Sequence, residues 1–267
     1  DIIMGNTVDV IIPVKNALHW VLKSIDELFV TSTNDFRQLI VVDDGSTPEN
    51  FRILSAHVAG RSRIQLVRNS GRPGYGGACN FGVAQSDADV FAFLNSDCLL
   101  TPGAIKKMAG FLERDPWIGM ICPLSNNSPV LTVQMRPGMN YRQMNASLEA
   151  AFSGADDSDI AIDACTVVGT CLVVTRTCWK TVGEFSPIWE LGYGEETDLQ
   201  FRAMKLGFRG VVALNTYVYH FGGGSFTDAK HDELRVRNHR KFMEIWGADY
   251  ARYAQKCAAR NPVTVAN

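Results

Sequence analysis

Two adjacent carboxylates, Asp43 and Asp44, directly follow an apolar run at residues 38–42 and precede a Gly-Ser pair. Carboxylates at the end of a strand could accept hydrogen bonds from a nucleobase N–H or from ribose hydroxyls. Because Asp, Gly and Ser are also ordinary turn formers, the pair taken alone fits a turn at least as well.

A second polar segment, Asn95-Ser96-Asp97, follows the apolar residues 90–94. A buried strand that ends in an acidic turn is suited to hold a divalent cation through oxygen ligands. Asp97 would be the ligand, and Asn95 would be a neutral oxygen or hydrogen-bond partner. The same residues could instead cap the next helix.

A glycine-rich segment, NSGRPGYGGACNFG, occupies residues 69–82. Glycines let the backbone approach a ligand closely, and amides at the start of a helix favour phosphate. Arg72 adds a cation that could meet a diphosphate, although a single arginine is also common on a solvated surface. The segment matches neither GxGxxG nor the GxxxxGK motif, so a simple turn stays an alternative.

The segment GYGEETD at residues 192–198 places Glu195 and Glu196 at a predicted helix start. The helix dipole favours negative charge there, which is one explanation. The other is a general base, because a carboxylate near other carboxylates has a raised proton affinity and can take a hydroxyl proton. His220 lies between an apolar run and a glycine-rich segment, where it serves either site chemistry or a structural hydrogen bond.

The apolar runs of the first half predict strands that alternate with helices. The strands are expected at 9–14, 38–42, 63–67, 89–94 and 118–122. The helices are expected at 18–29, from Pro48 behind a Ser46 or Thr47 cap, and from Pro102 behind a Thr101 cap. This alternation predicts a mostly parallel sheet with helices on both faces, where ligands bind beyond the carboxyl ends of the strands.

The second half is less regular. We expect an edge strand within 124–138, an acidic loop at 154–159, a β-rich run at 165–175, a helix at 197–206, a strand at 211–219 and a long helix at 228–246 that ends at Gly247. Neither a repeat nor a linker interrupts the pattern. One domain is therefore predicted, with a first half at about 9–122 and a second half at about 123–247.

The composition of the chain limits the kinds of partner and compartment that we expect. It has 267 residues, with 26 Lys plus Arg against 28 Asp plus Glu, so no basic excess exists for nucleic acid. The apolar runs are too short to span a bilayer. Seven cysteines without CxxC spacing are expected to be buried thiols in a reducing compartment. The first residue is Asp1, so we expect an excised piece of a longer protein, with further domains.

Taken together, these segments resemble the family 2 glycosyltransferases, whose fold is the GT-A type. The likeness runs from about residue 9 to residue 246 and keeps the order of the family. The matching stretches are DVIIPVKN (9–16), IVVDDGS (40–46), NSGRPGYGGACNFG (69–82), FAFLNSD (91–97), VVGTCLVVTR (167–176), GYGEETDLQFR (192–202) and YHFGGGSF (219–226).

The resemblance implies an inverting transfer of a sugar from a UDP- or dTDP-sugar to a hydroxyl of a glycan or lipid-linked acceptor. It implies a Mg²⁺ or Mn²⁺ cofactor, and a role in bacterial surface polysaccharide synthesis. The protein is then expected in the cytoplasm, at the inner face of the membrane, with peripheral membrane association and no transmembrane segment.

The resemblance also implies roles for matching residues. Those that would contact the nucleotide-sugar donor are Pro13, Asn16, Asp43, Asp44, Arg72, Gly74, Gly76, Asn80, Asn95 and Ser96. The metal or diphosphate ligands would be Asp97 and His220, and the catalytic base would be Glu196. The acceptor site would include Gly169, Trp189 and Glu195.

Two positions depart from the pattern of the family. Asn95 stands where its DxD motif has the first carboxylate, and Glu196 stands where Asp is common. The first departure suits a contact with ribose, but it also leaves open a non-catalytic glycan-binding or scaffold domain of a larger synthase. A sugar-phosphate nucleotidyltransferase fits less well, because no glycine-rich basic loop follows the first strand.

Overall fold

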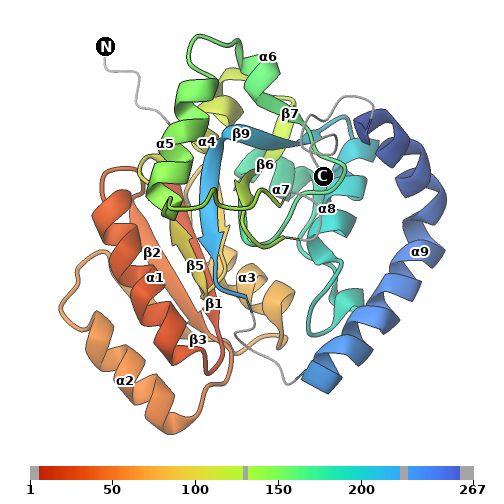
Figure 1. The fold of residues 1–267 in the computed structure, drawn as a ribbon. Coiled ribbons are helices and arrows are strands. Elements are labelled where there is room, and N and C mark those ends of the chain that lie inside the picture. Colours follow the sequence, from red (N-terminus) through yellow and green to blue (C-terminus); the bar gives the residue numbers. More distant parts are fainter. Residues whose placement is uncertain (1–5, 129–131, 223–227, 259–267) are drawn as a thin grey trace.

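The computed structural model describes residues 6–128, 132–222 and 228–258, and one mixed sheet forms the middle of this part of the chain (Figure 1). Its strand order is β3-β2-β1-β4-β8-β6-β9-β5, with β7 paired to β9. The strands are β1 (Val8–Val14), β2 (Gln38–Asp43), β3 (Ile64–Arg68), β4 (Val90–Leu94), β5 (Cys98–Leu100), β6 (Ile118–Ser125), β7 (Ala161–Asp163), β8 (Cys171–Thr175) and β9 (Arg209–His220).

The first four long strands, β3, β2, β1 and β4, pair in parallel as predicted. Their register places Val14 opposite Asp43 and Asp43 opposite Arg68, so their carboxyl ends share one edge. β8 runs antiparallel to both β4 and β6, and β9 runs parallel to β6. The predicted α/β class is thus confirmed, but the sheet is parallel throughout only from β3 to β4 and mixed beyond β4, because apolar runs do not encode strand direction.

Helices cover both faces of the sheet. Side chains of one strand alternate between the faces: Val10 and Ile12 of β1 pack in one core cluster and Ile11 in the other. The first cluster includes α1 (Leu18–Thr31), α2 (Pro48–Val58) and α4 (Ala104–Arg114). The second includes α3 (Tyr75–Ala84), α7 (Arg176–Val182) and α8 (Glu195–Lys205).

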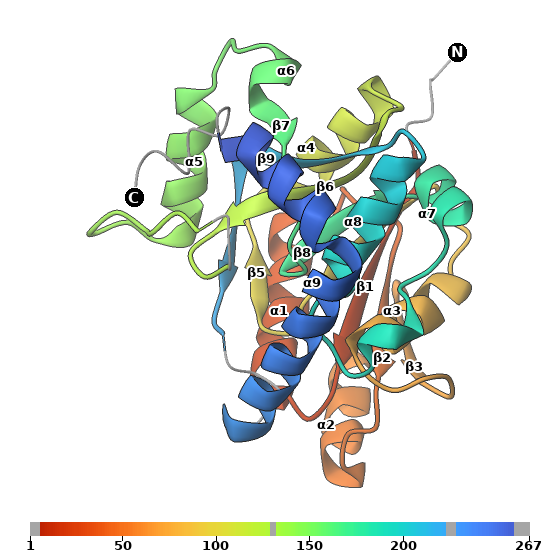
Figure 2. The same cartoon turned by 90° about the vertical axis from the view of Figure 1, so that its right-hand side faces the viewer.

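The remaining helices lie at the periphery. They are α5 (Tyr141–Ala151), α6 (Asp157–Ile160), the 3₁₀ turn η1 (Pro187–Trp189) and α9 (Asp228–Ala258). The long α9 crosses outside α8 (Figure 2). In the described ranges, every helix is too short or too polar to span a bilayer.

Two predicted helix ends are wrong. Thr101 does not cap α4, because its hydroxyl donates to the Tyr217 carbonyl (2.7 Å), and the helix begins behind Gly103 in a left-handed conformation. Gly247 does not end α9, because Tyr250 and Tyr253 beyond it pack on Phe201. That packing offsets the roughly 1 kcal/mol that a helical glycine costs relative to alanine.

Other predictions hold or need a local correction. Thr47 caps α2 by accepting from the Asn50 N–H (3.3 Å), as expected. The acidic loop contains the short α6 instead of being irregular throughout. The expected edge strand at 124–138 falls partly outside the described residues. Within them, Thr132 forms an isolated bridge to Ser125, the last residue of β6.

Candidate active site

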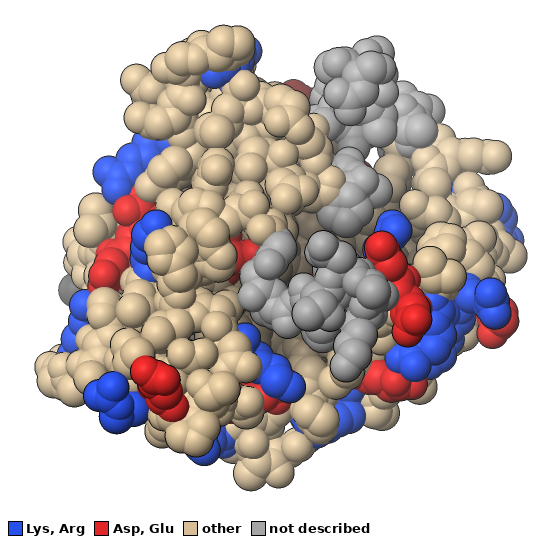
Figure 3. All heavy atoms as spheres, turned by 60° about the horizontal axis from the view of Figure 1, so that its bottom comes forward, with Lys and Arg blue, Asp and Glu red and all other residues tan. Residues whose placement is uncertain are grey.

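Three polar segments meet at the carboxyl edge of β1, β2 and β4. The Asn95 N–H donates to the Thr170 carbonyl (3.1 Å), which ties the segment after β4 to the turn before β8. That turn carries Gly169, whose Cα faces the Glu196 carboxylate at the start of α8. Figure 3 views this face and shows acidic and basic side chains interspersed around it.

Asp43 lies at the end of β2 and is 1% exposed. Its Oδ1 accepts from the Ser46 N–H (3.2 Å), while Oδ2 lies 3.4 Å from Arg68 Nε without a hydrogen bond among the described residues. Pro13 is buried on the adjacent β1. Asn16 adopts a left-handed conformation, and its Oδ1 accepts from the Thr47 N–H (2.8 Å). These contacts shape the turn at the predicted nucleoside pocket.

Asp44 joins β2 to the glycine-rich segment. Its Oδ1 accepts from Asn69 Nδ2 (2.7 Å) and its Oδ2 from the Gly74 N–H (2.8 Å). Gly74 has φ +94°, and a Cβ there would lie 2.6 Å from the Glu190 carbonyl oxygen. Only glycine therefore allows this close approach between the two loops.

Arg72 and Asn80 hold the segment before α8. Arg72 Nη1 donates to the Glu190 carbonyl (3.1 Å). The amide of Asn80 both donates to the Phe185 carbonyl (3.0 Å) and accepts from its N–H (3.1 Å). A Cβ on Gly76 would come within 3.1 Å of the Phe185 Cβ. Three residues predicted to contact the nucleotide-sugar thus connect α3 and the segment before it to residues 185–190.

Asp97 and His220 come together although 123 positions separate them. Asp97 Oδ2 lies 3.3 Å from His220 Nε2, and the Phe221 N–H donates to the Asp97 carbonyl (3.0 Å). His220 Nδ1 lies 2.7 Å from the Asn127 carbonyl, which favours a proton on Nδ1, and Nε2 is the nitrogen that faces Asp97. Burial lowers the pKa of His220, but the hydrogen bond and charge of Asp97 raise it, and the net shift is upward.

The third ligating atom within 4.8 Å of this pair belongs to Cys98, which the sequence analysis did not single out. Cys98 is fully buried, and burial raises the pKa of its thiol well above the usual range. The thiol therefore stays protonated. A carboxylate oxygen and an imidazole nitrogen suit Mg²⁺ or Mn²⁺ better than a thiol does, so the residues that fit a metal are Asp97 and His220.

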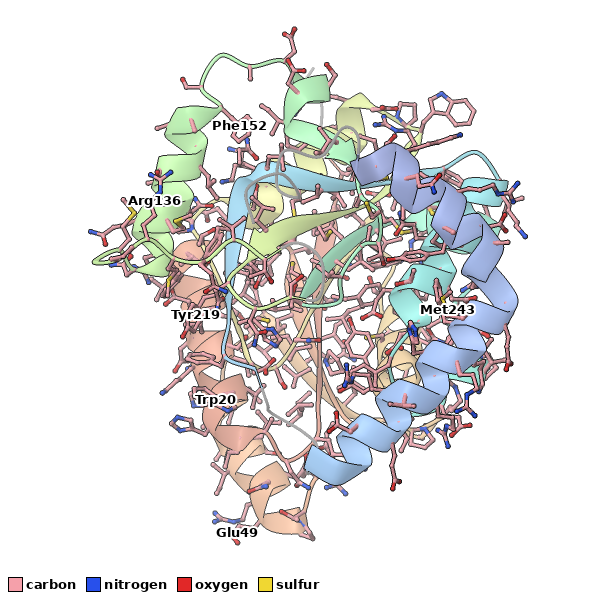
Figure 4. The ribbon with its side chains drawn as sticks, turned by 45° about the vertical axis from the view of Figure 1, so that its right-hand side comes forward. Trp20, Glu49, Arg136, Phe152, Tyr219 and Met243 are labelled. Carbon is pink, nitrogen blue, oxygen red and sulfur yellow. The ribbon has the colours of Figure 1, made fainter. Side chains whose placement is uncertain are left out.

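Aromatic side chains pack beside the segment that carries His220. Trp20 of α1 stacks on Phe221 with ring centroids 4.0 Å apart, and Tyr219 meets Phe221 edge-on at 4.9 Å. Figure 4 shows Trp20 and Tyr219 on the same side of the molecule. No pattern in the sequence predicts this contact, because Trp20 lies off the apolar stripe of its helix.

Glu195 and Glu196 are the first residues of α8, behind Gly194 with φ +116°. Burial raises the pKa of Glu196 to about 7, against the lowering effect of a backbone hydrogen bond. Burial and then the charge of Glu196 raise the pKa of Glu195 well above its usual range. Glu195 is 3% exposed, and its Oε2 has no partner among the described residues. Such a pair holds a proton near neutral pH.

Gly169 provides the space for the Glu196 carboxylate. A Cβ at Gly169 would lie 1.8 Å from Glu196 Oε1 and 3.3 Å from Tyr75 Oη. Any larger residue would displace the carboxylate, so a glycine is needed here to accommodate Glu196 in this position. The sequence resemblance had placed Gly169 in the acceptor site without this contact.

Trp189 is 1% exposed and packs under the turn that leads into α8. A Cβ at Gly194 would lie 2.8 Å from the indole Cε3. Asn238 of α9 donates through Nδ2 to the carbonyls of Trp189 (2.9 Å) and Gly192 (2.6 Å). A buried ring supports the shape of this turn and offers little surface to an acceptor.

The chain matches a known family model over residues 9–168, which is more than half of its length; the model is described as "Glycosyl transferase family 2". It is 23% identical over 240 residues to "Probable N-acetylgalactosaminyltransferase 6" of Caenorhabditis elegans, covering 83% of this chain and 39% of that protein. The chain thus spans about two fifths of the length of this curated relative.

Two solved structures share the fold. GalNAc-T7 with UDP, GalNAc and Mn²⁺ aligns with a TM-score of 0.70 at 13% identity, over 93% of this chain and 49% of that one. Glucosyl-3-phosphoglycerate synthase of Mycobacterium tuberculosis, with Mn²⁺ and UDP-glucose, aligns with a TM-score of 0.60 at 17% identity, over 90% and 79%. The predicted GT-A fold is confirmed.

Proposed function

The chain belongs to glycosyl transferase family 2, and from this premise we propose that it moves a sugar from a UDP- or dTDP-sugar to a hydroxyl of a glycan or lipid-linked acceptor, with inversion. One observation carries the proposal: the Glu196 carboxylate, with its pKa raised to about 7, rests against Gly169 at the same sheet edge as Asp97 and His220. A general base needs that proton affinity to work at neutral pH.

In the proposed reaction, Glu196 accepts the proton of the acceptor hydroxyl while the oxygen attacks the anomeric carbon. The bond from that carbon to the diphosphate oxygen breaks, and the leaving diphosphate keeps the electron pair. Attack opposite the leaving group inverts the anomeric centre. Glu195, adjacent and buried, has its pKa raised well above the usual range and so keeps its own proton, which leaves Glu196 as the carboxylate that accepts one.

Asp97 and His220 would hold a Mg²⁺ or Mn²⁺, which when bound would offset the charge of the diphosphate. The proposal is supported by the 3.3 Å approach of their side chains and by the hydrogen bond that fixes the His220 ring. Asn95 and Ser96 precede Asp97 on the same turn and would contact ribose.

The donor base is proposed to lie at the end of β2, beside Pro13 and Asn16. Carboxylates there can accept from the N3–H of uracil or thymine, since both bases present that edge. The two solved neighbours contain UDP or UDP-glucose, which supports a uridine donor.

We further propose a single catalytic domain with a donor half at about 9–122 and an acceptor half at about 123–247. The continuous sheet that joins β4 to β8 and β6 supports this. A role in bacterial surface polysaccharide synthesis at the inner face of the membrane rests on the family resemblance. The seven free cysteines are consistent with a reducing compartment.

A screen of UDP- and dTDP-sugars tests the proposal. We expect one donor to raise the melting temperature only together with Mn²⁺, and to be hydrolysed slowly without an acceptor. Stabilisation with no hydrolysis and no transfer to any glycan would instead support the non-catalytic domain.

Asp97→Asn is expected to raise the Mn²⁺ dissociation constant at least tenfold, because the variant loses the carboxylate of the proposed Asp97 and His220 ligand pair. Calorimetric titration of Mn²⁺ into the protein with UDP measures it directly. Asp87→Asn is the matched control, because Asp87 is exposed before β4, at the opposite edge of the sheet. Equal Mn²⁺ affinity in the two variants would remove Asp97 from the metal site.

The pH profile should have its acidic limb near pH 7. Glu196 must be deprotonated to act, and its raised pKa of about 7 means that kcat/KM falls tenfold per pH unit below that value. Initial rates between pH 5 and 9 at saturating Mn²⁺ measure the limb. A limb near pH 4.5, the ordinary value of a glutamate, would contradict the proposed environment.

A further inference from the structure

Tyr75 is the first residue of α3 and faces the turn before β8. Its Oη donates to the Gly169 carbonyl (3.3 Å), and its ring meets that of Phe185 at 6.0 Å. Its backbone N–H approaches the Leu191 carbonyl at 3.5 Å. Through its side chain and its backbone, Tyr75 therefore links α3 both to the turn before β8 and to the segment before α8.

The hydroxyl of Tyr75 and the carboxylate of Glu196 converge on one point. That point is where a Cβ on Gly169 would be, 3.3 Å from Tyr75 Oη and 1.8 Å from Glu196 Oε1. Burial, followed by the nearby Cys79 and Glu196, raises the pKa of Tyr75 well above its usual range. The hydroxyl therefore keeps its proton and acts as a hydrogen-bond donor.

We propose that Tyr75 is a positioning residue: its hydroxyl fixes the Gly169 carbonyl, and thereby the backbone against which the Glu196 carboxylate rests. The inference rests on the proposed function of Glu196 as the base. It adds a residue that neither the motifs nor the family match assigns.

The position of Tyr75 also connects the base to the donor pocket. The preceding residue, Gly74, donates its N–H to Asp44. One turn of chain therefore contacts the proposed nucleoside carboxylate on one side and the support of Glu196 on the other. Correct placement of the base thus depends on the same turn that shapes the donor pocket.

Tyr75→Phe tests the proposal because it removes only the hydroxyl. We expect kcat to fall at least tenfold, with the donor KM within twofold of the wild-type value. The acidic limb of the pH profile should move to higher pH, since a polar group is lost beside a carboxylate that burial already disfavours.

Tyr217→Phe is the matched control. The Tyr217 hydroxyl also donates to a backbone carbonyl, but it does so from β9 and to Val133 (2.7 Å) instead of Gly169. It should leave the limb unmoved. The proposal is overturned if the acidic limb of Tyr75→Phe stays in place or moves to lower pH. It is also overturned if Tyr75→Phe loses no more kcat than Tyr217→Phe does, or if Tyr75→Phe does not fold.

Glu196→Gln separates this proposal from the proposed function. If Glu196→Gln stays active, the base is wrongly assigned and the positioning role falls with it. If Glu196→Gln is inactive while Tyr75→Phe matches its control, the base stands and only the role of Tyr75 is refuted.

Discussion

Glu196→Gln is expected to lower kcat by about 10²- to 10⁴-fold, the usual contribution of one general base, while the affinity for the donor is kept. Glutamine has nearly the same shape as glutamate but cannot accept the proton of the acceptor hydroxyl. Single-turnover transfer measures the loss, and calorimetry with the UDP-sugar and Mn²⁺ measures donor binding.

The same variant should melt at a higher temperature than the wild type at pH 8. The pKa of Glu196 is raised from 4.5 to about 7 in the folded chain. The folded state therefore binds this proton more tightly than the unfolded state, and stability falls as pH rises through that window. Glutamine carries no charge and escapes this loss.

Glu113→Gln, on the exposed side of α4, is the control for both measurements, because it removes an acidic side chain away from the site. Wild-type turnover by Glu196→Gln would exclude this carboxylate as the base. A lower melting temperature at pH 8 would contradict an environment that disfavours the charged form of Glu196.

Gly169→Ala is expected to lower kcat by about 10²-fold, because the new methyl group would occupy the place of the Glu196 carboxylate. The clash at 1.8 Å forces Oε1 to move by more than 1 Å, and a displacement of that size can cost about 10²-fold in rate. Donor binding through Asp43 and Asp44 should be nearly unchanged, so the measurement is the ratio of kcat to the donor dissociation constant.

Gly110→Ala in α4 is the matched control, since its Cβ would meet only the flexible end of Arg114. It should keep full activity and gain a little stability, because alanine favours a helix. Equal activity of the two alanine variants would show that Glu196 does not need the space at Gly169.

The sequence predicted the strands and helices of residues 9–68 well, since buried strands such as β1 are continuous apolar runs and α2 carries its Thr47 cap. It missed α3, because small residues from Tyr75 to Ala84 have no helical stripe. It also missed the antiparallel insertion of β8 between β4 and β6, since strand order depends on distant pairing.

For the candidate site, motif order indicated Asp44, Asp97, Glu196 and His220, and the structure brings Asp97 to His220 and Gly169 to Glu196. The support of these residues was not predictable. Trp20 reaches Phe221 across the sheet edge, and Tyr75 reaches Gly169 across 94 positions. Such contacts follow from how loops approach one another in space, and no local spacing in the chain records them.

Asn238 binds two carbonyls of the turn that precedes the glutamate pair, and Trp246 donates to Asp198 (2.9 Å) on the same helix as that pair. The last helix thus supports the segment that carries the proposed base, although it contributes no residue to the proposed reaction. A shortened or grafted version of this chain should therefore retain α9. Without it, the protein is expected to bind the nucleotide-sugar but to lose transfer activity, because Glu196 would lose its support.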